Sequence, residues 1–131
     1  MNPVDPFDLP EWLATEEVTW HAVSTDRAGH LIHGLLTAGP DREWPCNLLA
    51  VDQAWPRTVA ASEVRESVHQ TWRNGEVELV EVDGALTLLT PGAGFSSGRV
   101  MVTLERFTRA VGARADNYVA AIRLGSFAAD D

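Results

Sequence analysis

Three stretches rich in apolar and β-branched residues follow one another in the first half of the chain. They span residues 17–24, 30–38 and 46–53. Such stretches, bounded by turn residues, are typical of β-strands. A turn at residues 25–29 joins the first two, which we therefore expect to form a hairpin. Gly39-Pro40-Asp41 separates the second strand from the third.

Two later segments place apolar residues at helical spacing. Val64, Val68 and Trp72 recur at i, i+4 and i+8, which predicts a helix over residues 58–74. The second helix ends at Gly112, and its apolar stripe consists of Val100, Leu104, Phe107 and Val111. Its first turn, residues 99–102, could instead form a strand.

The remaining elements follow from turn and cap signals. Asp83-Gly84, between apolar segments 76–82 and 85–90, is a strong hairpin signal. Asp8 in front of Leu9-Pro10 predicts a short helix, and residues 118–124 a last strand. Residues 1–7 and 126–131 are expected to be loose tails of one domain that spans residues 1–131.

These elements give the order α-βββ-α-ββ-α-β. Because the strands come in consecutive groups with helices between them, the fold class is α+β. We expect a mainly antiparallel sheet that is built from hairpins, with two long helices.

The net charge narrows the choice of partner. The 131 residues carry ten basic and nineteen acidic side chains, a net charge of −9. This charge argues against binding to nucleic acid or to an anionic membrane surface. It is also uneven, at −10 for residues 1–98 and +1 for residues 99–131.

Two residue types limit the possible chemistry. Every basic residue is Arg, as in proteins of GC-rich bacterial genomes, and the absence of Lys excludes a phosphate-binding P-loop and a Schiff base. The single cysteine, Cys46, cannot form an internal disulfide and opens an apolar strand, which favours a buried structural thiol. The first residues resemble no signal peptide and no apolar run could span a bilayer, so we expect a cytoplasmic protein.

The histidines do not form a metal motif. His30 and His33 would point to opposite faces of a strand. Together with Cys46 and His69 they match no zinc spacing. We therefore expect no metal, no cofactor and no catalytic residue.

The glycine-rich segment 92–98 could bind an anion at the start of the second helix, through Gly94, Ser96, Ser97 and Gly98. Its spacing is G-x-G-x-x-x-G, which differs from the dinucleotide-binding motif. The alternative is a flexible hinge in which Ser96 or Ser97 caps the helix.

Arginine and tryptophan supply the other candidate binding residues. Arg99, Arg106 and Arg109 lie on one side of the second helix, either as a solvated face or as a strip that docks carboxylates. Five Trp in a chain with one Tyr is an unusual number. Large rings fill cores but also line pockets, and we single out Trp20 and Trp55.

The order of elements over residues 8–112, together with the small size and the acidity, resembles the type III secretion chaperones and their chaperone-like relatives. The resemblance implies a homodimer that binds a segment of another protein and carries out no chemistry. The strand at residues 118–124 departs from that order.

Three functions follow. The first is a non-catalytic, protein-binding or chaperone-like adaptor that acts as a homodimer. The second is a small-ligand-binding protein or minor enzyme, with a pocket between sheet and helices; the candidate lining is Trp20, His21, His33, Asp52 and Trp55. The third is an immunity or antitoxin partner, because acidic surfaces mask basic toxins.

Overall fold

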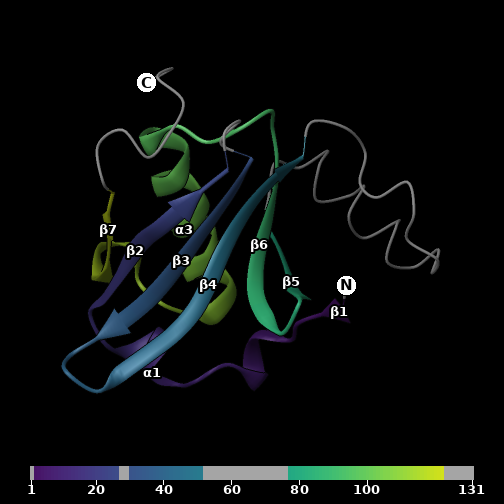
Figure 1. Ribbon diagram of the computed structural model, residues 1–131. Helices are drawn as coiled ribbons and strands as arrows, with labels where there is room; N and C mark the ends of the chain where they lie inside the picture. Colours follow the sequence, from purple (N-terminus) through teal and green to yellow (C-terminus); the bar gives the residue numbers. More distant parts are fainter. Residues whose placement is uncertain (1, 27–29, 52–76, 123–131) are drawn as a thin grey trace.

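Seven β-strands form one mixed sheet in the order β1-β5-β6-β4-β3-β2-β7 (Figure 1). The computed structural model describes residues 2–26, 30–51 and 77–122. The strands are β1 (Asn2–Pro3), β2 (Val18–Thr25), β3 (Leu31–Ala38), β4 (Arg42–Val51), β5 (Glu78–Val82), β6 (Ala85–Pro91) and β7 (Tyr118–Ala121).

One long helix, α3 (Ser97–Val111), packs on one face of this sheet (Figure 1). The short helix α1 (Trp12–Thr15) and the 3-10 turns η1 (Pro6–Asp8) and η2 (Ala115–Asn117) complete the described elements. The expected helix over residues 58–74 and the expected tail at 126–131 lie outside the described residues.

The sheet differs from the predicted one in its pairing. The β2–β3 and β5–β6 pairs are antiparallel hairpins, as expected, and β3–β4 is a third antiparallel pair. However, β6 runs parallel to β4, and β7 runs parallel to β2. The prediction of a mainly antiparallel sheet with two long helices is therefore wrong: the sheet is mixed, with one long helix among the described residues. Local turn signals predict hairpins, whereas parallel neighbours arise from crossovers that carry no short-range signal.

The core lies between α3 and the facing side of the sheet. Trp20 is fully buried there, and its indole N–H donates to the carbonyl of Cys46 at 2.9 Å. The ring crosses Gly34 on the neighbouring strand, where any Cβ would overlap it. The other large, fully buried side chains of this core are Phe95, Phe107, Leu13, Ile32, Leu36, Leu48, Leu88, Leu104 and Val18.

Helix α3 begins and ends at the residues that the sequence suggests. The Ser96 hydroxyl accepts from the backbone N–H of Arg99 at 3.3 Å, and Gly112 ends the helix with a φ of 79°. The predicted stripe packs as expected, with Val100, Leu104 and Phe107 buried. The alternative of a strand at residues 99–102 is wrong, because these residues are helical.

The turn between β5 and β6 has the conformation that its sequence predicts. Asp83 and Gly84 both have positive φ angles, 52° and 81°. Two consecutive left-handed residues are the mark of a type I′ turn, whose twist matches that of the paired strands. The turn therefore holds β5 and β6 in a defined register.

The N-terminal segment is ordered along the sheet edge instead of forming a loose arm. Pro3 pairs with Val80 of β5, and the backbone N–H of Val4 donates to the Leu79 carbonyl at 3.0 Å. The Asp5 carboxylate then caps η1 by accepting from the N–H of Phe7 at 2.9 Å. The segment thus crosses the end of the sheet beside the β5–β6 turn (Figure 1).

The opposite edge of the sheet is joined to the core through Tyr118, the first residue of β7. Its hydroxyl donates to the carbonyl of Leu13 at 2.7 Å. Its ring meets that of Phe107 edge-on, with centroids 6.0 Å apart. Residues 118–121 form the predicted last strand, and residues 123–124 lie outside the described ranges.

Candidate functional site

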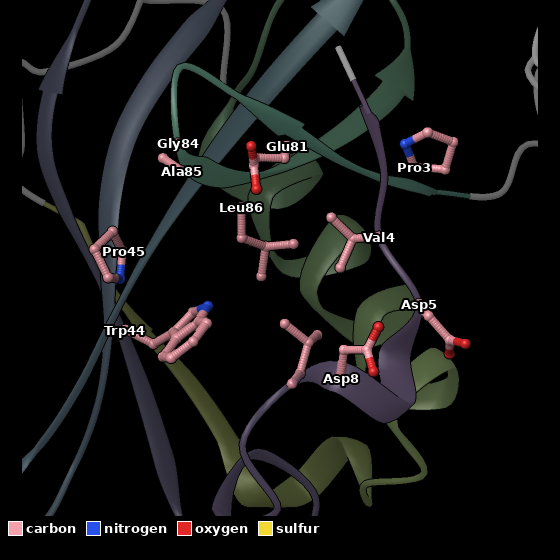
Figure 2. A pocket seen from close by; sticks show the side chains of 11 residues that line it. Pro3, Val4, Asp5, Asp8, Trp44, Pro45, Glu81, Gly84, Ala85 and Leu86 are labelled. Atoms are coloured by element: carbon pink, nitrogen blue, oxygen red, sulfur yellow. The ribbon is translucent and has the colours of Figure 1, made fainter.

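An open cavity of about 390 Å³ lies where the N-terminal segment passes the β5–β6 turn (Figure 2). We call it the N-terminal groove. Its lining comes from three parts of the chain. The N-terminal segment contributes Pro3, Val4, Asp5, Asp8 and Leu9, β4 contributes Trp44 and Pro45, and the β5–β6 hairpin contributes Glu81, Gly84, Ala85 and Leu86.

The floor of the groove is apolar. Val4, Leu9 and Trp44 are half-buried and pack against the core cluster, and Leu86 is 6% exposed. In Figure 2 the side chains of Val4, Leu86 and Trp44 point toward one another around the open space. The floor therefore extends the hydrophobic core to the surface.

Trp44 occupies this position because of the alternation along β4. Cys46, Leu48 and Ala50 are buried on the face that α3 covers, and Trp44 lies on the same face two residues earlier. It is nearer the end of the sheet and keeps part of its ring exposed. The position therefore supplies a large aromatic surface to the groove.

The rim of the groove carries carboxylates. Asp8 reaches it from η1, and Glu81 reaches it from β5 on the other side (Figure 2). Asp5 also lines the groove, but its carboxylate turns away from the open space and caps η1. None of the eleven lining residues is basic. The arrangement is therefore suited to a ligand that has both apolar surface and positive charge.

Of the two singled-out tryptophans, Trp20 is a core residue. It is fully buried, hydrogen-bonded to Cys46, and does not line the groove. The prediction of a binding role for Trp20 is wrong, because its ring is enclosed between the sheet and α3. Trp55 lies outside the described residues.

The segment 92–98 is anchored to the fold. Phe95 is buried, and the N–H of Gly92 donates to the Val51 carbonyl at 2.8 Å. Ser96 caps α3, as predicted in the alternative to an anion site. Its hydroxyl therefore serves the helix itself. Gly94 precedes the cap, and Ser97 and Gly98 form the first turn of α3.

The three arginines of α3 do not form one exposed strip that could dock carboxylates. The Arg99 guanidinium folds back to donate to the Pro91 carbonyl and lies over the Phe95 ring, 5.8 Å from its centroid. Arg109 forms an exposed pair with Glu105 at 3.5 Å, and Arg106 is partly exposed. Arg99 therefore holds the preceding loop, while Arg106 and Arg109 remain on the surface.

The alternative pocket between sheet and helices is not formed by the residues proposed for it. Trp20 faces α3, whereas His21 and His33 lie on the opposite face of the sheet. The His21 Nε2 is 3.0 Å from the Thr37 hydroxyl. Asp52 lies outside the described residues. In residues 2–26, 30–51 and 77–122, no cluster of three or more His, Cys, Asp or Glu could hold a metal ion.

Two buried groups have raised pKa values. Burial raises the pKa of the Cys46 thiol, which confirms a structural thiol. Burial also raises the pKa of the Tyr118 phenol, and the nearby Cys46 adds to the effect because two anions would repel each other. Neither group is therefore ionised at neutral pH.

None of the groove residues stands out as a binding residue in the sequence. The third strand was expected to begin at residue 46, which left Trp44 outside it, whereas β4 begins at Arg42. Extending the strand by alternation would have placed Trp44 on the core face. No sequence signal shows that the N-terminal segment pairs with β5.

Comparisons with protein-family models, with curated proteins and with solved structures found no match to the chain. Within the described ranges, no helix has the length and apolar character that crossing a membrane requires.

Proposed function

We propose that the protein is a non-catalytic, chaperone-like adaptor that holds a segment of a partner protein in the N-terminal groove. The observation that carries the proposal is the groove itself, which has a partly exposed apolar floor and a polar rim. Contiguous apolar surface that is rimmed by polar residues marks interaction sites on protein surfaces. The resemblance to type III secretion chaperones that the sequence suggests implies the same function.

The frame of the groove is preorganised for binding. Its floor rests on β4 and β6, which are paired in register from Cys46↔Leu86 onward. Its rim is fixed by the type I′ turn on one side and by the capped η1 on the other. A rigid site loses little conformational entropy when it binds, which favours affinity.

A peptide selection tests this proposal. Random peptides displayed on phage are selected on the immobilised full-length protein, and the affinities of the selected peptides are measured by titration. We expect Trp44→Leu to weaken binding by about tenfold or more, because it removes the largest apolar surface of the floor. Trp12→Leu is the matched control, since Trp12 is also partly buried against the core but lies outside the groove.

Two outcomes would contradict the proposal: no peptide is selected, or both Trp variants weaken binding equally while remaining folded. The second outcome would place the peptide elsewhere or show a general effect on stability.

We also propose that the adaptor is a homodimer. The solvent side of α3 exposes Met101 and Val102, at 42% and 44%, next to Arg106 and Arg109. This side offers apolar surface for contact with a second copy. Light scattering during gel filtration should give twice the mass of the chain; a strict monomer at high micromolar concentration would contradict the dimer.

A small-molecule ligand is a second candidate for the same groove. Its volume of about 390 Å³ falls within the range of roughly 300–1,000 Å³ that small-molecule sites occupy. A thermal-shift screen of organic amines and nucleotides tests this candidate, and no shift across the screen would argue against it.

A further inference from the structure

We propose that the N-terminal groove selects a basic side chain, an Arg or Lys, from the bound segment. The aliphatic stem lies on the apolar floor, and the charged group lies between Asp8 and Glu81. This inference rests on the proposed adaptor function and names the chemistry of its partner.

The charges of the groove favour a cation. Asp8 and Glu81 are exposed and lie on opposite sides of the open space (Figure 2). The ion pairs among the described residues engage Glu16, Glu105 and Asp116, and no basic side chain lines the groove. A cation in the groove therefore has two carboxylates to approach, and no positive charge of the lining opposes it.

The floor suits the shape of a long basic side chain. Lys and Arg place their methylene stems on apolar surface while the charged end stays near water. The partly exposed Trp44 ring adds a surface over which a guanidinium or ammonium can stack. An acidic segment would meet repulsion from Asp8 and Glu81, and a purely apolar segment would leave the carboxylates without a partner.

The net charge of the protein favours a foreign segment over a second copy as the occupant of the groove. A second copy carries −9 and would bring that charge to the carboxylates of the groove, whereas a basic partner is attracted to them. On α3, the Arg109 side chain is already paired with Glu105. The expected occupant is therefore a basic segment of another protein.

The test uses two short blocked peptides, acetyl-Gly-Leu-Arg-Leu-Gly-amide and the same peptide with citrulline, the neutral isostere of Arg. Both are titrated into the ¹⁵N-labelled full-length protein while the indole N–H signal of Trp44 is followed. That signal is assigned by its loss in Trp44→Phe. We expect the Arg peptide to bind about tenfold more tightly at low salt and the difference to shrink as salt screens the charges.

Two double variants, each lacking two carboxylates, show which carboxylates cause the preference for the Arg peptide. Asp8→Asn with Glu81→Gln should remove the preference for Arg over citrulline. The matched control is Asp41→Asn with Glu43→Gln, exposed carboxylates that lie outside the groove. Each double variant neutralises two carboxylates and changes the net charge from −9 to −7, so long-range attraction is equal in both. The control should keep the preference.

The inference is overturned if citrulline binds as well as Arg, or if the two double variants lose the preference equally. It is also overturned if butylguanidinium alone binds as tightly as the Arg peptide, which would show a site for a free small cation. Failure of this inference is distinguishable from failure of the adaptor function. Selected peptides that lack basic residues but shift the Trp44 signal would refute the basic side chain and support the adaptor, whereas the selection of no peptide would contradict the adaptor itself.

Discussion

At the scale of single residues, the packing of Trp20 on Gly34 organises the centre of the core. The indole N–H satisfies the Cys46 carbonyl, and the ring fills the space that a side chain at position 34 would occupy. Three neighbouring strands, β2, β3 and β4, are thereby joined through one side chain. This contact explains why the largest ring described in the core is buried and unavailable for binding.

Gly34→Ala should lower the free energy of unfolding by about 1–3 kcal/mol, because the added methyl group overpacks a filled core. Gly98→Ala is the control. It lies in the first turn of α3, where an added Cβ would meet only the Ser96 Oγ at 4.0 Å, an ordinary contact. Because Ala favours helix over Gly, the free energy should be unchanged or higher by up to about 1 kcal/mol. Urea denaturation of both variants measures the difference; equal effects would contradict the packing described for Trp20.

The raised pKa values of Cys46 and Tyr118 predict a loss of stability at alkaline pH. In the unfolded chain the thiol loses its proton near pH 8.5 and the phenol near pH 10, whereas in the folded protein both hold their protons to higher pH. The folded state therefore binds more protons above pH 8.5, and stability falls as pH rises. With no Lys in the chain, these are the side chains that titrate in this range.

We expect the free energy of unfolding to drop by about 1–2 kcal/mol between pH 7.5 and pH 10. Cys46→Ala should be less stable throughout but should lose less on going to pH 10. Urea titrations at several pH values give both slopes, and equal slopes for the two proteins would show that the thiol does not cause the loss.

At the scale of elements, the structure shows which parts the sequence could predict. The hairpins and α3 follow from local signals such as Asp83-Gly84, the Ser96 cap and the terminal Gly112, and they formed as expected. The position of β6 beside β4, and the pairing of Pro3 with β5, depend on contacts between distant segments. For this reason the groove, which three distant segments build, could not be predicted from the sequence. The β5–β6 turn at its rim could be, because its signal is local.

Arg99 and Arg109 make different contacts on α3, so their removal should affect stability differently. Arg99→Met removes the donor to the Pro91 carbonyl and the charge over Phe95, and should cost about 1–2 kcal/mol of stability. Arg109→Met removes an exposed ion pair and should change stability by less than about 0.5 kcal/mol. Thermal and urea unfolding compare the two; similar costs would mean that Arg99 does not hold the loop.

At the scale of the whole molecule, charge and shape favour the same partner. The net charge of −9 attracts basic proteins at long range, and the N-terminal groove offers apolar surface with carboxylates at its rim. The excess of acidic residues before residue 99 includes two carboxylates that the fold brings to the same groove. Asp8 and Glu81 lie far apart in sequence and frame a single opening.

The central claim is that partner segments bind in the N-terminal groove. The most direct measurement is amide NMR of the full-length protein with a peptide taken from the selection. We expect the largest chemical-shift changes in residues 3–9, at Trp44 and Cys46 on either side of Pro45, and in residues 81–86. Changes concentrated instead on the solvent side of α3 or along β7, with the groove signals unmoved, would contradict it.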